Sequence, residues 1–127
     1  MLQPEKYISC LHIRKFLIAY SRFRCSSHRL EIEQGRQNGT LLENRICKLC
    51  EADGEIIIED EYHFLLNCPR YDGLREIYIP KEYMENKSYN TFIILMSTEC
   101  EQTIKSVASF IVAAINQRNK YLEELNT

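Results

Sequence analysis

Four cysteine and histidine residues in the middle of the chain have the spacing of a zinc site. Cys47 and Cys50 are followed by His63 after twelve residues and by Cys68 four residues later, which gives Cys-x2-Cys-x12-His-x4-Cys. Zn²⁺ prefers four tetrahedral thiolate and imidazole ligands, and a Cys-x2-Cys turn lets two sulfurs reach one ion. Four protein ligands leave no open position for a catalytic water, so the pattern predicts one structural Zn²⁺.

Two other states of these cysteines have to be weighed against zinc. Six cysteines could form three disulfides in a secreted chain, or they could stay as unliganded core thiols. The charged start of the chain, with Glu5 and Lys6, does not resemble a secretory peptide, so we expect an intracellular protein, nuclear or cytoplasmic, without disulfides. The three cysteines outside the pattern are predicted to be small core residues: Cys10, Cys25 and Cys100.

The residues around His63 predict how this ligand meets Cys68. Asp60 is placed to cap a short helix over residues 61–67, and Glu59 and Glu61 are expected to complement its dipole. Five residues is an awkward helical spacing for two ligands of one ion. Pro69 disfavours helical geometry at Cys68, so we expect the last turn to open and bring the two side chains together.

The elements that must position these ligands are mainly helical. We predict helices over residues 5–24, 29–34 and 92–96, and a long one over 99–125 opened by a capping box of Thr98 and Glu101. One face of the long helix should carry a buried apolar stripe of Ile104, Val107, Ala108, Ile111, Ile115, Leu122 and Leu125. Ser26 or Ser27 should cap the second helix and Gly35 should end it. The only candidate β element is the run 55–58. The expected fold is therefore mostly α, a small helical domain with a Cys-Cys-His-Cys zinc knuckle and at most one short β ribbon.

Length and composition favour one domain. With 127 residues, 45% hydrophobic and 27% charged, the chain fits a single globular unit. Its segments are predicted as N-terminal helices (5–36), zinc knuckle (45–75) and C-terminal helices (88–125). No apolar run approaches the roughly 20 residues that cross a bilayer, so no membrane association is expected.

The first predicted helix is apolar on two sides. Leu11 and Ile18 lie on one face, and Phe16, Tyr20 and Phe23 lie on the opposite one. Such a helix needs cover on both sides. Either the protein's other helices provide it, or a partner protein does.

Positive charge is concentrated at the front of the chain. Residues 1–50 hold nine Lys and Arg against four Asp and Glu, whereas residues 51–101 hold four against twelve. A basic surface of this kind can contact the phosphates of RNA or DNA. The predicted nucleic-acid contacts are Arg24, Arg29, Arg36, Arg45 and Lys48, with further candidates at Arg14, Lys15 and Arg22. Tyr71 and Arg75 could either join this contact or pack on the zinc knuckle.

Catalytic motifs are not found in the sequence. Zinc deaminases place a His-x-Glu motif ahead of Pro-Cys-x-x-Cys. Here the Cys-x-x-Cys pair precedes the histidine, and the position two residues after His63 is Leu65 instead of Glu. A phosphate-binding loop, a nucleophile elbow and a polymerase acidic pair are also missing from the sequence. We therefore expect a non-enzymatic protein. The alternative to a nucleic-acid-binding module is a structural or protein-interaction domain in which zinc only staples the fold.

Four segments together carry a resemblance to a known family. They are His28–Arg36, Arg45–Cys50, Glu59–Tyr71, and the pair Leu74 and Arg75. This string resembles the zinc-binding domain that follows the reverse transcriptase in non-LTR retrotransposon polyproteins, over roughly residues 5–125. The resemblance implies that Cys47, Cys50, His63 and Cys68 are the zinc ligands. It also implies that the domain helps hold RNA or target DNA beside a reverse transcriptase, here as a detached tail without polymerase or endonuclease.

Overall fold

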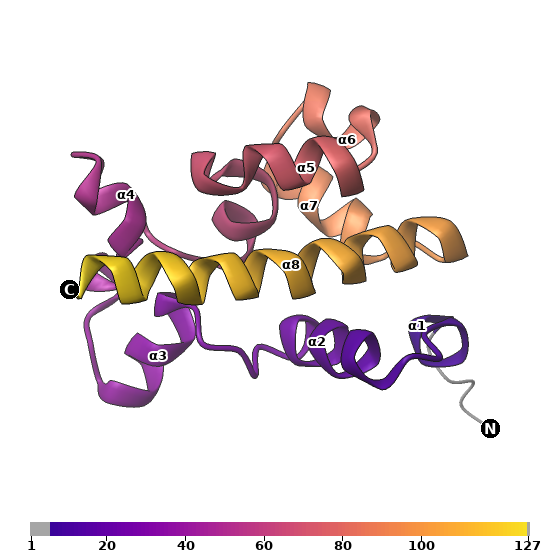
Figure 1. Cartoon of the computed structure of the whole chain (residues 1–127), viewed down its shortest axis with the longest axis horizontal. Helices are drawn as coiled ribbons and strands as arrows, with labels where there is room; N and C mark the ends of the chain where they lie inside the picture. Colours follow the sequence, from indigo (N-terminus) through magenta and orange to yellow (C-terminus); the bar gives the residue numbers. More distant parts are fainter. Residues whose placement is uncertain (1–5, 127) are drawn as a thin grey trace.

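The computed structural model, which describes residues 6–126, is built around one long helix. Helix α8 (Glu101–Leu125) runs the length of the molecule, with other helices on both of its sides (Figure 1). Its inner face buries a stripe spaced three and four residues apart, which includes Ile104, Val107, Ala108 and Ile111. The predicted C-terminal helix and its apolar stripe are confirmed. The stripe ends earlier than predicted, because Leu125 is 45% exposed.

The other helices are short and lie on either side of α8. Below it in Figure 1 lie α1 (Lys6–Cys10) and α2 (Arg14–Arg24), and above it lie α5 (Asp72–Tyr78), α6 (Lys81–Glu85) and α7 (Tyr89–Met96). Near the C-terminal end of α8 lie α3 (Glu31–Asn38) and α4 (Lys48–Ala52). Three short turns complete the elements: η1 (Leu42–Asn44), η2 (His63–Asn67) and η3 (Pro69–Tyr71).

Strand structure is nearly absent from residues 6–126. A single antiparallel bridge joins Ile46 and Ile58. The prediction of a mostly α fold with at most one short ribbon is confirmed. Within the same residues, no helix has the length and apolar character needed to cross a membrane.

The predicted helix over 5–24 is wrong as one continuous element. The chain breaks between α1 and α2, where Ile13 is extended (φ −83°, ψ 121°) and Leu11 is buried. In a continuous helix Tyr7 and Tyr20 would be about 20 Å apart along the axis. The break folds α1 back, so their rings lie 5.0 Å apart. The gain in buried aromatic surface explains a break that neither Gly nor Pro marks.

This region also settles which elements cover α2. Tyr20 and Phe23 are buried, and α2 packs on α8. The ring of Phe23 lies 5.8 Å from that of Phe64 and 6.5 Å from that of Phe92. The protein's own helices therefore bury this side of α2.

The boundaries of the second predicted helix are wrong at both ends. Helix α3 begins at Glu31, not after Ser26 or Ser27, and it ends at Asn38, followed by the capping residue Gly39 with its left-handed φ of 72°. Gly35 lies inside the helix. A Cβ there would stand 2.4 Å from Cγ of Arg45, so glycine is required because the arginine side chain crosses the helix at this point.

The predicted capping box of α8 does not form. Helix α8 begins at Glu101 after Cys100, and the Thr98 hydroxyl accepts a hydrogen bond from the Cys100 backbone N–H (3.1 Å). The predicted core helix over 92–96 exists as the longer α7. Of its residues, Leu95 and Met96 are buried, but Ile93 and Ile94 face outward.

Replacing a buried residue of α8 should destabilise the whole fold. We expect Ile111→Asp to lower the free energy of unfolding by several kcal/mol, because an unpaired carboxylate in an apolar core is either desolvated or forced to take a proton. The matched control is Ile56→Asp, at an isoleucine that is 70% exposed, with an expected change of at most about 0.5 kcal/mol. Urea unfolding followed by circular dichroism measures both. Equal effects of the two substitutions would contradict the central role of α8.

Candidate metal centre

The first two candidate ligands lie at the start of α4. Cys47 immediately precedes the helix, and its backbone N–H donates to the carbonyl of Ile57 (2.7 Å) next to the Ile46 to Ile58 bridge. Cys50 lies one turn later, so both thiols project from the same side of the helix. The bridge thus holds the extended segment that positions Cys47.

The other two candidate ligands are joined by a widened helical turn. Asp60 Oδ1 accepts a hydrogen bond from the His63 backbone N–H (2.8 Å), as the predicted cap requires. The Cys68 N–H then donates to the His63 carbonyl (2.7 Å), five residues back, which is π-helical geometry. The expected opening of the last turn is thereby confirmed, and it takes the form of a π turn that ends at Pro69.

The four candidate ligand atoms converge at one buried point. All lie within 4.8 Å of one another. Cys50 Sγ stands 3.8 Å from Cys68 Sγ and 3.5 Å from His63 Nε2. A tetrahedral ion with bonds of about 2.3 Å to sulfur and about 2.0 Å to nitrogen would place such pairs about 3.8 Å and about 3.5 Å apart. The cluster therefore has the chemistry and the dimensions of a metal site.

The electrostatics of the thiols also fit a cation. A hydrogen bond from the Cys68 thiol lowers the pKa of Cys47 to about 3. Burial and the negative charge of Cys47 raise the pKa of Cys50 to about 11. The pKa of Cys68 is raised as well, because its thiol proton is held by Cys47 and because it is buried. Burial and the charge of a neighbouring thiolate thus oppose further negative charge in the cluster, and a divalent cation would offset that opposition.

Arg75 is hydrogen-bonded to backbone carbonyls of the π turn and of Cys68. Its guanidinium donates to the carbonyls of Leu65 (Nε, 2.9 Å), Phe64 (Nη2, 2.9 Å) and Cys68 (Nη1, 2.5 Å), and the side chain is 1% exposed. Burial lowers the pKa of Arg75. Tyr71 is equally buried against the rings of Phe64 and Phe110. For both Tyr71 and Arg75, packing on the metal-site segment is confirmed, and neither is available to a ligand at the surface.

Glu59 has a role that its position before the predicted helix did not indicate. Its carboxylate accepts two hydrogen bonds from the Arg118 guanidinium (2.7 and 2.9 Å) and one from the Glu31 backbone N–H (2.7 Å). Burial raises the pKa of Glu59, and Arg118 opposes that shift. The expected dipole role is wrong for Glu59, which instead caps α3 from outside and ties it to α8. The signal for Arg118 was its place on the apolar stripe of α8, seven residues after Ile111.

The predicted basic contacts near the metal loop are mostly engaged within the protein. Arg45, predicted as a nucleic-acid contact, is only partly exposed, because its side chain crosses Gly35 and donates to the carbonyls of Thr40 (2.9 Å) and Ile32 (3.3 Å). Arg36 donates to the Glu33 carboxylate, with Nε to Oε1 at 2.8 Å. Lys48 Nζ lies 3.4 Å from Glu31 Oε1. The side chains of Arg36 and Lys48 remain largely exposed.

The remaining predicted contacts lie at the end of α2 and in the turn after it. Arg29 is exposed. Arg24 donates to the Met96 carbonyl and lies over the ring of Tyr7, 5.5 Å from its centroid.

Outside the metal cluster, Cys10 is buried as predicted, but Cys25 and Cys100 are exposed, so the core prediction is wrong for these two. His28 is paired with Glu61 (Nε2 to Oε2, 2.8 Å).

Comparison with known proteins adds no relative. Neither family models, nor curated proteins, nor solved structures gave a match to this chain.

Proposed function

We propose that this chain is a non-catalytic helical module held together by one structural Zn²⁺ at Cys47, Cys50, His63 and Cys68. The observation that carries the proposal is the agreement of the 3.8 Å and 3.5 Å ligand-atom distances with a tetrahedral zinc site. Three thiolates and one imidazole are ligands that suit Zn²⁺. With all four positions taken by buried side chains, the ion would have no vacant position for water or substrate, which supports a structural role.

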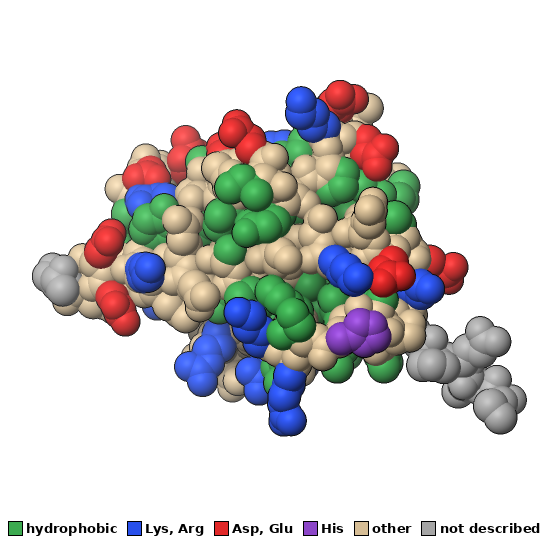
Figure 2. Space-filling view, turned by 45° about the vertical axis from the view of Figure 1, so that its right-hand side comes forward, with side chains coloured by type: hydrophobic (Ala, Val, Ile, Leu, Met, Phe, Trp, Pro, Cys, Tyr) green, Lys and Arg blue, Asp and Glu red, His purple; other side chains and the backbone are tan. Residues whose placement is uncertain are grey.

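We propose further that the module contacts RNA or DNA weakly through a basic surface on α2 and the turn that follows it. This surface, here called the α2 basic surface, consists of Arg14, Lys15, Arg22 and Arg29, all exposed. From Lys6 to Leu30 the chain has no Asp or Glu. Figure 2 shows Lys and Arg side chains gathered below α8, where α2 lies, while acidic side chains line the opposite edge.

This location differs from the one expected from the sequence. Arg36, Arg45 and Lys48 are held by Glu33, backbone carbonyls and Glu31 respectively, so using them for phosphate would mean giving up these partners. Arg14, Arg22 and Arg29 make no ion pair within the described residues. They can therefore neutralise phosphate without losing an internal contact, and they are the residues we assign to the interface together with Lys15.

A salt titration tests the nucleic-acid contact. With about four cations facing one strand, we expect affinity for a single-stranded RNA 20-mer to be micromolar or weaker and to fall steeply with salt. Arg14→Ala combined with Arg22→Ala should reduce the slope of log affinity against log salt by about 1.4, since each phosphate contact on a single strand contributes about 0.7.

The matched control removes the same charge elsewhere. Lys81 and Lys87 are exposed on the α6 side of the molecule, across α8 from the α2 basic surface. Lys81→Ala combined with Lys87→Ala should leave the slope unchanged. Absence of RNA or DNA binding by the unmodified protein at about 50 mM salt would reject the nucleic-acid contact and leave the zinc proposal standing.

We propose a retroelement origin on the basis of the sequence resemblance. Its support is the combination of the Cys-Cys-His-Cys order with Glu59-Asp60-Glu61 before His63 and Pro69 and Tyr71 after Cys68. On this proposal the module works inside the cell, in the nucleus or cytoplasm, and its protein partner is a reverse transcriptase or another protein that covers the exposed apolar residues of α1 and the following break. Ile8 and Ile13 are such residues.

A further inference from the structure

Helix α7 presents apolar residues on the side that faces away from the core. Leu95 and Met96 are buried, whereas Ile93 and Ile94 are 56% and 61% exposed and Tyr89 is 60% exposed. The exposed part of α7 also includes Asn90, so its outward side is apolar at Ile93 and Ile94 but not throughout. The two adjacent isoleucines form an exposed apolar patch, which is the kind of surface that protein partners cover.

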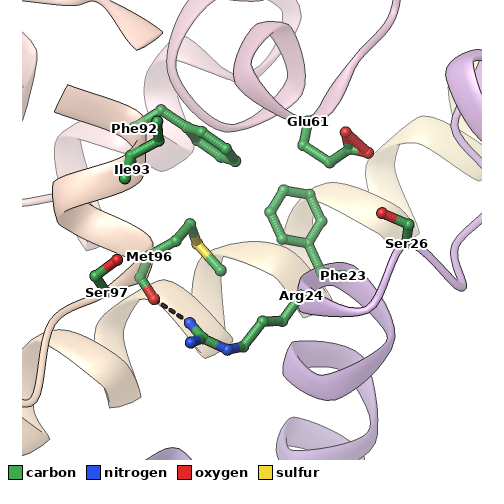
Figure 3. Close-up of a pocket in the computed structure, with 8 residues that line it drawn as sticks. All are labelled: Phe23, Arg24, Ser26, Glu61, Phe92, Ile93, Met96 and Ser97. Carbon is green, nitrogen blue, oxygen red and sulfur yellow. Dashed lines mark hydrogen bonds between the residues drawn. The ribbon is translucent and has the colours of Figure 1, made fainter. Parts of the chain in front are cut away.

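A pocket of about 320 Å³ lies next to Ile93, between α7 and the end of α2. Phe23, Phe92 and Met96 form its apolar walls, and Ile93 is part of its lining (Figure 3). The pocket can accept an aliphatic side chain, and the exposed Ile93 in its lining and the next residue, Ile94, are of that kind. The same surface thus carries exposed aliphatic side chains and a pocket that can accept one.

The two charged groups at the pocket have opposite signs and lie across it from each other. Figure 3 shows Glu61 beside Ser26 at one side and Arg24 reaching under Met96 at the other. Glu61 holds His28 with one carboxylate oxygen, and Arg24 donates to the Met96 carbonyl. Both groups are thus fixed in position while they line an open pocket.

We propose that this surface binds a second copy of the chain across a two-fold axis. In a two-fold interface the same patch meets itself in reverse order. Arg24 of each copy would then face Glu61 of the other, and α7 of each copy would present its isoleucines to the pocket of the other. A partner carrying one sign of charge would match only one side of the pocket. This inference rests on α7 and the pocket, so it stands or falls independently of the nucleic-acid contact.

Sedimentation velocity of the zinc-loaded protein tests the proposal. Between about 1 and 200 μM we expect a shift from monomer to dimer, as for a dissociation constant in the micromolar range. Ile93→Asp and Ile94→Asp should each weaken dimerisation by at least about tenfold, because each would bury a carboxylate at the interface. Ile56→Asp, at an isoleucine exposed to a similar degree on the metal loop, should leave the dimer unchanged.

Charge reversal gives a signature that only a two-fold interface produces. Arg24→Glu alone and Glu61→Arg alone should each be monomeric, because each homodimer would place like charges together twice. Mixing the two variants should restore a dimer, since the glutamate introduced at position 24 of one then meets the arginine introduced at position 61 of the other, and the remaining native pair is intact. A protein that stays monomeric at about 200 μM, or a mixture that does not associate although both variants retain zinc and helical content, would overturn the proposal.

Discussion

Protein purified without chelator is expected to contain one equivalent of zinc per chain, and removing it should unfold residues 45–75. The three buried thiols and one imidazole stand at coordination distance, and burial and mutual repulsion oppose thiolate charge in the cluster unless a cation offsets it. Metal binding in small sites of this type contributes on the order of 10 kcal/mol to local folding. Chelation should therefore abolish amide protection in residues 45–75 in hydrogen exchange.

The cysteines themselves provide a matched control for this prediction. Cys50→Ser should lose the bound metal and the protection of residues 45–75. Cys25→Ser, at an exposed cysteine outside the cluster, should keep one equivalent of zinc and full protection. Elemental analysis identifies the metal and its amount. Less than about half an equivalent of zinc in the unmodified protein would contradict the assignment.

Arg75→Met is expected to lower the free energy of unfolding of the zinc-loaded protein by about 3–5 kcal/mol. The substitution keeps much of the side-chain volume but removes the guanidinium donors from the buried carbonyls of Phe64, Leu65 and Cys68. Of these, the Cys68 carbonyl keeps a hydrogen bond from the Tyr71 N–H (3.2 Å). These carbonyls belong to the π turn between the last two ligands. The bound metal should therefore also change its environment, which the visible spectrum of the Co²⁺-substituted protein would record.

Two further variants separate this effect from ordinary loss of an arginine. Arg70→Met removes a partly exposed arginine that pairs with Asp53 and lies over Tyr121, and we expect a cost below about 1 kcal/mol with an unchanged Co²⁺ spectrum. Arg75→Lys keeps the charge but not the planar array of donors, so it should recover only part of the loss. A stability of Arg75→Met within about 1 kcal/mol of the unmodified protein would refute the role given to Arg75.

Local signals in the sequence predicted much of the candidate site. The ligand spacing, the Asp60 cap and the break at Pro69 all act over a few residues, and the structure realises each of them. The long helix over 101–125 was predictable for the same reason, because an apolar stripe repeats along a single element. Local pattern thus described the candidate metal site and the main helix.

What the sequence could not supply are contacts between distant segments. Glu59 and Arg118 pair across 59 positions, and Arg45 meets Gly35 only after α3 has folded against the loop. The break between α1 and α2 likewise follows from Tyr7 reaching Tyr20, not from any breaking residue. Tertiary packing overrode local preference at each of these places. An arginine on an apolar helical stripe, as at position 118, was the one visible sign of such a contact.

The order of these residues along the chain also bears on how the protein is made. All four candidate metal ligands precede α8, and the loop that a metal would close between Cys47 and Cys68 is short. Metal capture can thus take place on the ribosome while α8 is still unsynthesised. The carboxylate of Glu59 cannot form its ion pair until Arg118, 59 residues later, has been translated. Synthesis therefore separates closure of the metal-site loop from docking of α8, and the buried ion pair can form only after Arg118 has emerged.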